Sequence, residues 1–349
     1  MMENMEKVNS EAIYLIRKGE AKKAFEQRSF QIHSPEEGEV MIEVEAFGLN
    51  FADVMARKGL YREAPPMPCV VGYEVVGKIM MTGKGVSEEL LGKRVVAFCR
   101  FGGYARHVLT PAHAVAEINT APAEDAMALC TQAVTAYYMA NYLTPVRKGE
   151  RVLIHAAAGG VGTILIQLVK LQGGIVFAKI GDRSKEDLVR SLGADFVLNY
   201  NTSDYKLQLQ KLLNQDRLDV SFNPSGGSTF KKDMALLGSG GRLILFGGAE
   251  LTSGKWGIFS QLNFIRKMGT IIPVGLMMRS KNILGVNMLK IADHKPEVLT
   301  ACMREVVELY ISGKLIPQRG PTFKANEISS AHTALESGKS TGKITVFWK

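Results

Sequence analysis

A short segment in the middle of the chain constrains the fold more than any other part of the sequence. Residues 152–162 read VLIHAAAGGVG, an apolar run that ends in a glycine-rich turn, and an apolar stretch of helical character follows from Thr163 to Leu171. A strand that turns through glycines directly into a helix opens the β-α-β unit that binds dinucleotides. The turn requires small residues at Ala156, Gly159 and Gly162. Larger side chains there would keep the backbone away from a pyrophosphate and the helix away from the strand.

Strands and helices alternate from this turn onwards. Six segments of strand length are separated by stretches of helical patterning, and they are residues 152–155, 175–180, 196–199, 219–222, 242–246 and 283–287. The alternation predicts an α/β fold with a doubly wound parallel sheet. The helix after the first strand would then offer an anion free N–H groups and a partial positive charge. The alternative is a glycine-rich turn in an α/β protein that binds no nucleotide.

The two ends of the chain have a different pattern. Period-two alternation from Val40 to Ala46, and a second β-rich stretch from Val70 to Met80, predict short strands in the first third. Helical patterning begins at Asp125, and another helix is predicted from Pro296 to Ser312. The final β-like stretch, Gly342 to Trp348, is expected to return to the first domain.

A length of 349 residues suggests two domains. We expect a discontinuous domain made of residues 1–129 and 292–349, with the nucleotide-binding domain, residues 130–291, inserted into it. The connection between the fifth and sixth strands, residues 247–282, is rich in glycine, aromatic and basic residues. Its length favours a functional or interface segment over an idle loop.

Composition and charge narrow the class of protein. Apolar residues make up 46% of the chain and charged residues 22%, close to the average of globular proteins, so the whole chain should fold. The net charge of +9 could indicate nucleic acid as a partner, but the basic residues form isolated pairs without a run of five. A solvated surface that also attracts an anionic cofactor is the simpler interpretation, and no nucleic-acid partner is expected.

The cysteines and the N-terminus favour a cytoplasmic protein. The four cysteines, Cys69, Cys99, Cys130 and Cys302, form no CxxC pair and are expected to be reduced thiols. The N-terminal residues MMENMEKVNS contain no apolar stretch that would indicate a signal peptide. The longest apolar run, residues 152–169, contains a histidine and three glycines and predicts a strand, turn and helix, so no membrane span is expected.

The residues after the second predicted strand bear on the choice of cofactor. An NAD enzyme places a carboxylate here for the ribose 2′-hydroxyl, but this strand ends in Ile180 and continues as GDRSK over residues 181–185. Arg183 and Lys185 could hold a 2′-phosphate by charge-assisted hydrogen bonds. NADPH is therefore favoured. Asp182 opposes this interpretation, because it would repel the phosphate unless it caps the next helix.

Several motifs in the first half of the chain, together with the glycine turn, resemble one enzyme family. They are GLNFADVMARKGLY at residues 48–61, Pro68, GYEVVG at 72–77 and TQAVTAYY at 131–138. They resemble the medium-chain dehydrogenase/reductase superfamily over nearly the whole chain. Within it, the chain looks closest to the zinc-independent quinone oxidoreductases, zeta-crystallin included. LNFADVMARKGLY, together with NILGVNML at residues 282–289, is similar to the vesicle amine transport protein branch.

This resemblance implies a GroES-like β-rich catalytic domain beside a Rossmann domain, and it implies site residues. The positions it implies near the reacting nicotinamide ring are Asn50, Tyr61, Thr135, Phe246, Gly247, Val286 and Asn287. On the phosphate side it implies Gly159, Gly160, Val161, Gly181, Lys185 and Tyr200, which join Gly162 and Arg183. Asn50 and Thr135 would orient the carboxamide or the substrate oxygen, and Tyr61 is a candidate proton donor. The alternatives are that Asn50 holds a tight loop and that Tyr61 is a half-buried aromatic.

The chain departs from the zinc enzymes of this family. It has no cysteine in the loop at residues 48–51, and Tyr73 stands where those enzymes have a histidine. Glu74 alone cannot bind zinc, and no Cys and His in the chain have ligand-like spacing, so no metal is expected. Without a Lewis acid the substrate must already be electron-poor, which fits quinones and α,β-unsaturated carbonyls. A further departure is Asn223, which stands where relatives often carry an acid.

Other functions and other assemblies are compatible with the same motifs. The chain could bind NADPH and act mainly as an interaction protein, as the vesicle amine transport resemblance suggests, or bind RNA as some relatives of zeta-crystallin do. A basic stripe with stacking aromatics, expected of the latter, is not visible in the sequence. The apolar strand at residues 283–287 is expected to lie at the sheet edge and to pair two chains in a homodimer. Alternatively, residues 247–282 cover that edge and the protein is a monomer.

Overall fold

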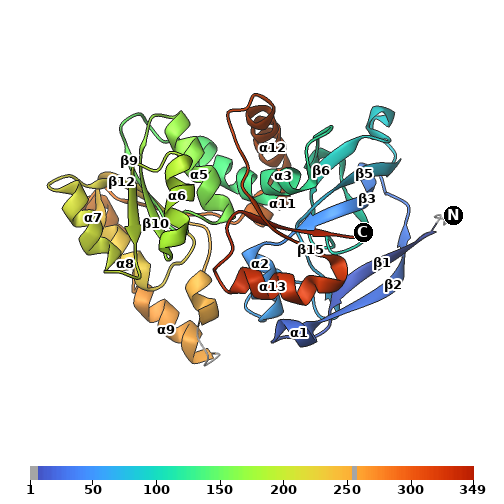
Figure 1. The fold of residues 1–349 in the computed structure, drawn as a ribbon, viewed down its shortest axis with the longest axis horizontal. Helices are drawn as coiled ribbons and strands as arrows, with labels where there is room; N and C mark the ends of the chain where they lie inside the picture. Colours follow the sequence, from blue (N-terminus) through green and yellow to red (C-terminus); the bar gives the residue numbers. More distant parts are fainter. Residues whose placement is uncertain (1–6, 254–257) are drawn as a thin grey trace. The chain divides into compact units, whose positions relative to one another are not determined.

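The structure is a computed structural model that describes residues 7–253 and 258–349. The chain divides into two compact units, residues 1–134 with 289–349 and residues 135–288 (Figure 1). The first unit is discontinuous, and the second unit lies between its two segments along the chain. The domains inferred from the sequence, with limits at 129/130 and 291/292, stay a prediction.

The first unit is built mainly from antiparallel sheet. One sheet has the order β2-β1-β4, and a larger one has the order β15-β16-β3-β5-β6-β8, with β7 also paired to β3. Its strands are β1 (Lys7–Leu15), β2 (Phe25–His33), β3 (Glu39–Gly48), β4 (Cys69–Val70), β5 (Glu74–Thr82), β6 (Arg94–Phe98), β7 (His107–Pro111), β8 (Val115–Glu117), β15 (Arg319–Lys324) and β16 (Lys343–Phe347). Helices α1 (Ala21–Ala24), α2 (Phe51–Arg57), α3 (Ala123–Met127), α12 (Pro296–Ile311) and α13 (Ile328–Glu336) belong to the same unit, and α11 (Met288–His294) begins at its border.

The C-terminal strand returns to the first unit as predicted. β16 pairs antiparallel with β3, so that Thr345 lies opposite Gly48 and Phe347 opposite Ala46. Its apolar residues join the core that β3, β5 and β6 build, and Val346 is fully buried. This return is what carries residues from the end of the chain into the neighbourhood of the loop after β3.

The β-rich stretch predicted from Val70 to Met80 is two strands, β4 and β5, separated by a bend at residues 71–73. Gly72 causes the break, because its φ of 100° belongs to the left-handed region that favours glycine. A Cβ at Gly72 would also lie 2.5 Å from the ring of Tyr104. The bend sets Tyr73 and Glu74 at the start of β5, next to the site described below.

The second unit has the predicted parallel sheet. Six strands lie in the order β11-β10-β9-β12-β13-β14, and all neighbouring pairs are parallel. The strands are β9 (Arg151–Ile154), β10 (Ile175–Ile180), β11 (Phe196–Asn199), β12 (Leu218–Asn223), β13 (Leu237–Leu245) and β14 (Asn282–Gly285). The helices are α4 (Val134–Tyr137), which starts at the border, α5 (Gly160–Leu171), α6 (Glu186–Ser191), α7 (Tyr205–Leu213), α8 (Ser228–Leu236), α9 (Ile258–Met268) and α10 (Pro273–Met278). The predicted fold class is therefore confirmed.

Helices cover both faces of this sheet (Figure 1). On one face Leu153 and Phe177 form a buried cluster with apolar residues of α7 and α8. Side chains alternate along a strand, so the neighbouring residues Ile154 and Ala178 point to the opposite face, where α5 packs on β9 and β10. The carboxyl ends of the parallel strands meet at one edge of the sheet, which is where ligands bind in folds of this type.

Two predicted strand bounds were wrong. β13 begins at Leu237 and not at residue 242, because three glycines between residues 238 and 241 hid its first half from the pattern. β14 ends at Gly285, so Val286 and Asn287 follow the strand and do not belong to it. The connection at residues 247–282 contains α9 and α10, with residues 254–257 outside the described part of the chain. Among the helices that the structure describes, none combines the length and the apolar character needed to cross a bilayer.

Candidate functional site

The glycine turn after β9 has the geometry that its sequence predicts. Ala156 has a φ of 49°, in the left-handed region, where a bulky residue would be strained. A Cβ at Gly162 would meet the carbonyl oxygen of Ala156 and would lie 2.7 Å from the Cα of Ala157. Gly159 closes the turn by donating to the same carbonyl of Ala156 over 2.9 Å. The turn therefore admits only small residues at these positions.

The N-terminus of α5 fits a phosphate group. The helix begins at Gly160, and among the described residues no side chain caps it. The N–H groups of its first turn, which Gly160, Val161 and Gly162 supply, have no acceptor within the helix. With the positive end of the helix dipole, these donors suit a pyrophosphate. The residues present fit the dinucleotide that the sequence predicts.

Asp182, whose role the sequence left open, caps a short helical turn. Its side chain accepts a hydrogen bond of 2.9 Å from the backbone N–H of Ser184 at the start of residues 183–185. Arg183 is exposed and Lys185 is half-buried in that turn. Burial lowers the pKa of Lys185, while Asp182 raises it. The carboxylate of Asp182 therefore bonds the backbone of this turn, and the cations Arg183 and Lys185 follow directly after β10.

Gly181 and Tyr200 come together at the same edge of the sheet. A Cβ on Gly181 would collide with the hydroxyl of Tyr200, so a larger residue there would displace the tyrosine side chain. Asn201 donates from its side-chain amide to the carbonyl of Gly181. Tyr200 is 50% exposed at this edge. Gly181 and Tyr200, two of the residues that the resemblance implies for the phosphate side, therefore lie at one place.

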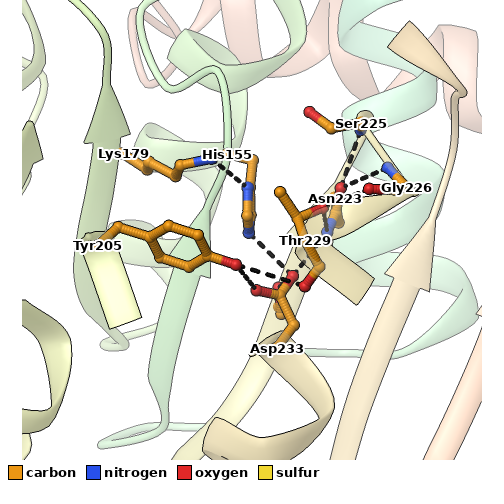
Figure 2. Close-up of polar contacts among 9 residues, drawn as sticks. His155, Lys179, Tyr205, Asn223, Ser225, Gly226, Thr229 and Asp233 are labelled. Carbon is orange, nitrogen blue, oxygen red and sulfur yellow. Dashed lines mark hydrogen bonds and ion pairs between the residues drawn. The ribbon is translucent and has the colours of Figure 1, made fainter. Parts of the chain in front are cut away.

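A buried polar cluster beneath this edge was missed by the sequence analysis. Figure 2 shows His155 between Lys179, at the end of β10, and Asp233 of α8. The Nδ1 of His155 lies 3.2 Å from the ammonium of Lys179, and its Nε2 lies 2.9 Å from a carboxylate oxygen of Asp233. Tyr205 donates to the other oxygen of Asp233 over 2.7 Å. These side chains come from four separate segments of the chain, so no local pattern marks them.

The same carboxylate explains the departure at Asn223. The amide of Asn223 donates to Asp233 over 2.6 Å and to Thr229 over 2.8 Å (Figure 2). Its oxygen accepts from the backbone N–H groups of Ser225 and Gly226 and shapes the turn after β12. An acid at position 223 would place two carboxylates together. Here α8 supplies the acid and the strand supplies the amide.

Four of the residues implied near the nicotinamide ring follow the carboxyl ends of two adjacent strands. Phe246 and Gly247 follow β13, and Val286 and Asn287 follow the adjacent strand β14. The N–H of Val286 donates to Leu245 over 2.9 Å, which continues the ladder past the strand. A Cβ at Gly247 would lie 2.7 Å from the carbonyl oxygen of Pro224, so glycine lets the turns after β12 and β13 approach. Thr135, the remaining implied residue of this unit, is buried in α4.

The first unit holds a second buried polar cluster, around Asn50. Asn50 donates to Glu74 over 2.7 Å and accepts from the ammonium of Lys343 over 2.9 Å. Lys343 also forms an ion pair with Glu74, and both side chains are fully buried. The second oxygen of Glu74 accepts from the backbone N–H of Thr131 over 2.7 Å. Every oxygen of this carboxylate is therefore in use within the protein.

Lys343 was also missed by the sequence analysis. It opens β16, whose pairing with β3 brings the ammonium next to the loop after Gly48. A Cβ at Gly48 would lie 2.5 Å from Lys343 Cε and 2.6 Å from Glu74 Oε1. Glycine at the end of β3 therefore makes room for this ion pair.

Two tyrosines and an acid lie close to this cluster. The rings of Tyr61 and Tyr73 meet edge to face with centroids 6.2 Å apart. Burial raises the pKa of both hydroxyls above the ordinary value, so both remain protonated at neutral pH. Asp53 is fully buried, and burial raises its pKa to about 7, although the N–H of Asn50 bonds it over 2.8 Å.

Comparison with known families identifies the superfamily. Residues 36–120 match the model of the alcohol dehydrogenase GroES-like domain, and residues 160–310 match the model described as zinc-binding dehydrogenase. The two models follow one another in the order of a catalytic domain and a nucleotide-binding domain. The chain belongs to the medium-chain dehydrogenase/reductase superfamily. The family resemblance inferred from the sequence is confirmed, and the matches below place the chain in the branch of quinone oxidoreductases and VAT-1 homologues.

Curated relatives of this superfamily include the VAT-1 homologues. The synaptic vesicle membrane protein VAT-1 homolog of Danio rerio is 30% identical over 309 residues, 88% of this chain and 63% of that protein. The human VAT-1 homolog is 28% identical over 313 residues, which cover 89% of this chain and 79% of that protein. The chain thus spans less than two thirds of the zebrafish relative.

Solved structures of the superfamily share the fold over nearly the whole chain. The Escherichia coli quinone oxidoreductase, complexed with NADPH, has a TM-score of 0.84 at 25% identity and covers 97% of this chain and 99% of its own. The quinone oxidoreductase of Thermus thermophilus, also described with NADPH, has a TM-score of 0.78 at 29% identity with the same coverage. The chain therefore has the fold of NAD(P)H-dependent oxidoreductases of the quinone oxidoreductase type.

The residues present do not suit the zinc that one of the matched models is named for. Zinc is bound by thiolate, imidazole and carboxylate donors, whereas Asn50 and Tyr73 supply an amide and a phenol. Glu74 is already paired with Lys343, whose charge would repel a metal ion. In the described part of the chain, no group of three or more His, Cys, Asp and Glu residues could hold a metal.

Proposed function

We propose that the protein is a zinc-independent, NADPH-dependent reductase that transfers hydride to a quinone or an α,β-unsaturated carbonyl. The observation that carries this proposal is the ion pair of Glu74 with Lys343. It leaves the catalytic unit with a buried ammonium in place of a Lewis acid. The relatives crystallised with NADPH support the choice of cofactor, as do Arg183 and Lys185 after β10.

The chemistry follows from what this site can and cannot supply. When bound, NADPH supplies hydride from C4 of its nicotinamide. Without a metal to polarise an alcohol or an ordinary ketone, the acceptor must already be electron-poor, as quinones and enones are. The residues of the chain therefore bind, orient and protonate.

Asn50 is the proposed orienting residue of the first unit. Its amide carries two N–H donors, and the structure uses one of them toward Glu74. The second can donate to a carboxamide or substrate oxygen, while Lys343 and Glu74 fix the plane of the amide. Thr135 has a hydroxyl suited to the same task.

Tyr61 is the proposed proton donor. Its pKa is raised by burial, so the phenol is protonated at neutral pH and can deliver a proton to the enolate or phenolate that forms when the acceptor takes hydride at another atom. Phe246, Gly247, Val286 and Asn287 are proposed to flank the nicotinamide, and Gly159, Gly160, Val161 and Gly162 to hold the pyrophosphate. The four cysteines are buried free thiols, which supports a reducing, cytoplasmic environment.

Steady-state oxidation of NADPH with a panel of acceptors tests this function. We expect turnover with quinones and enones, and none with simple saturated ketones, because only the first two accept hydride without a Lewis acid. Turnover with saturated ketones would contradict the proposed chemistry. Tight NADPH binding without turnover of any acceptor would favour an interaction protein of the kind that VAT-1 homologues suggest.

A further inference from the structure

Lys179 is a lysine in the interior of the nucleotide-binding unit that the proposed function does not use. It is the penultimate residue of β10, and its side chain is 8% exposed. Its backbone carbonyl accepts from Ala157 over 3.1 Å and so ties the glycine turn to β10. Burying a long cationic side chain at this point of the strand costs free energy unless its charge is paired or hydrogen-bonded.

Among the described residues, the ammonium of Lys179 has no direct counter-ion. Its Nζ bonds Nδ1 of His155, and the carboxylate of Asp233 stands on the far side of that imidazole (Figure 2). No carboxylate in the described part of the chain lies within 4 Å of it. The remaining contacts are two aromatic faces, with the ring centroids of Tyr200 at 4.8 Å and of Tyr205 at 4.4 Å. A buried cation held by π-systems and one imidazole can still attract an external anion.

Tyr200 connects this buried charge to the proposed cofactor site. The face of its ring lies over the ammonium, and its hydroxyl abuts Gly181, the first residue after β10. The ribose of a dinucleotide is expected at this point of the fold. A cation against the face of a phenol withdraws electron density from the ring, and the hydroxyl becomes a stronger hydrogen-bond donor.

We propose that Lys179 is a specificity-determining residue for a phosphorylated ribose, which it recognises through the hydroxyl of Tyr200 and through its own positive charge. The inference rests on the proposed NADPH site and deepens it. Lys179 acts from beneath the sheet edge, whereas Arg183 and Lys185 act from the surface. It is a positioning residue, because its ammonium contacts the ring of Tyr200 and not the phosphate.

The charge on Lys179 is expected to titrate within a pH range in which cofactor binding can be measured. Burial lowers its pKa to about 8, opposed by the nearby negative charge of Asp233. The other charged and titratable groups that face it are Lys232, Tyr205, Asp204, Glu250 and His155. The second pKa of a phosphate monoester is about 6, so the phosphate itself does not titrate above pH 7. Affinity for NADPH should therefore fall between pH 7 and 9, while affinity for NADH should not.

Equilibrium binding of NADPH and NADH to the full-length protein, followed by nicotinamide fluorescence, tests the proposal. Lys179→Met keeps the length of the side chain and removes its charge. We expect it to weaken NADPH binding about tenfold or more, the effect of losing support for a charged hydrogen bond, and to leave NADH binding within about twofold. The matched control is Lys211→Met, which removes the charge of an exposed lysine on α7 and should change neither affinity.

A double-mutant cycle with Tyr200→Phe separates this role from a structural one. Phenylalanine keeps the ring and removes the hydroxyl, so the losses from Tyr200→Phe and Lys179→Met should be strongly non-additive for NADPH. Additive losses, equal losses for NADPH and NADH, or unchanged NADPH binding in Lys179→Met would overturn the inference. If Lys179→Met does not fold, the wild-type pH profile decides, and an NADPH affinity that is flat from pH 7 to 9 refutes the role of Lys179. Wild-type protein that binds neither dinucleotide would instead refute the proposed function.

Discussion

Each of the two buried polar clusters contains a buried lysine, Lys343 beside Asn50 and Lys179 beside His155. Asn50 and Glu74 belong to recognisable motifs, but Lys343 is 293 residues from Asn50 and 269 from Glu74 in the chain. Lys179 is similarly hidden, within the apolar strand IVFAKI. A lysine in an amphipathic or apolar strand is normally expected to reach solvent. Only the tertiary pairing of strands shows that these two do not.

Asp53 should make stability depend on pH. Its folded pKa of about 7 lies above the ordinary 3.8, so the folded protein keeps a proton that the unfolded chain releases between about pH 4 and 7. The free energy of unfolding must then decrease as pH rises through this window. Relative to Asp53→Asn, the wild type should lose up to about 4 kcal/mol, since one pKa unit corresponds to about 1.4 kcal/mol.

Denaturant unfolding of the wild type and Asp53→Asn at pH 4 and at pH 7.5 measures this difference, because other carboxylates contribute equally to both proteins. A difference that does not change with pH would show that Asp53 is ionised in the folded state.

Lys185 should distinguish the two dinucleotides. Removing its charge with Lys185→Ala is expected to weaken NADPH binding by about 1 to 3 kcal/mol, the scale of a charged hydrogen bond, and to leave NADH nearly unaffected. Lys211→Ala, an exposed lysine on α7, is the control for a change in net charge. Isothermal titration gives both affinities, and equal losses for NADPH and NADH would exclude contact with the 2′-phosphate.

Elements with strong local signals were predicted well, and elements that depend on glycine were not. The bounds of β10 and β11 agree with the pattern, because β-branched and aromatic residues fill them. The start of β13 was missed at Gly238, Gly240 and Gly241, which lie where the register with β12 shifts between Leu237 and Arg242. The segment 247–282 has no strand pattern, and its helices α9 and α10 expose apolar side chains such as Met277 at 73% and Met278 at 80%.

The edge strand of the parallel sheet predicts how two chains assemble. β14 lies at the end of the sheet as expected, so one side of it is unpaired within the described part of the chain. The N–H of Val286 donates to Leu245 of β13. Because N–H groups point to alternate sides along a strand, those of Ile283 and Gly285 face the unpaired edge. We expect a homodimer formed through this edge.

Gly285→Pro tests this assembly, with Gly285→Ala as its control. A Cβ at Gly285 meets no atom within 4 Å, so Gly285→Ala should fold like the wild type, and proline alone removes an edge donor. Light scattering after size exclusion should give twice 38.2 kDa for the wild type and for Gly285→Ala, and a smaller mass for Gly285→Pro. A wild-type mass of one chain at micromolar concentration would exclude the dimer.

At the scale of the whole molecule, motifs spread over both units carried the prediction of the fold. The motif at residues 48–61 lies within the first matched family model, and the second model begins inside the glycine turn. From the sequence, the chemistry of the site could be inferred only from absent zinc ligands. The loop at residues 48–51 has no cysteine, and Tyr73 stands in place of a histidine. The structure supplies the positive reason, since Lys343 and Asn50 satisfy Glu74 without a metal.

The proposed zinc-independent reduction is tested most directly by the rate of NADPH oxidation with a quinone or enone acceptor, measured before and after exhaustive removal of metal ions. The stripped protein should contain only trace zinc and keep its full kcat, because Lys343 already neutralises Glu74 and the acceptor needs no Lewis acid. Added zinc should not increase the rate. Loss of activity together with stoichiometric zinc, and its recovery when zinc is restored, would contradict the account.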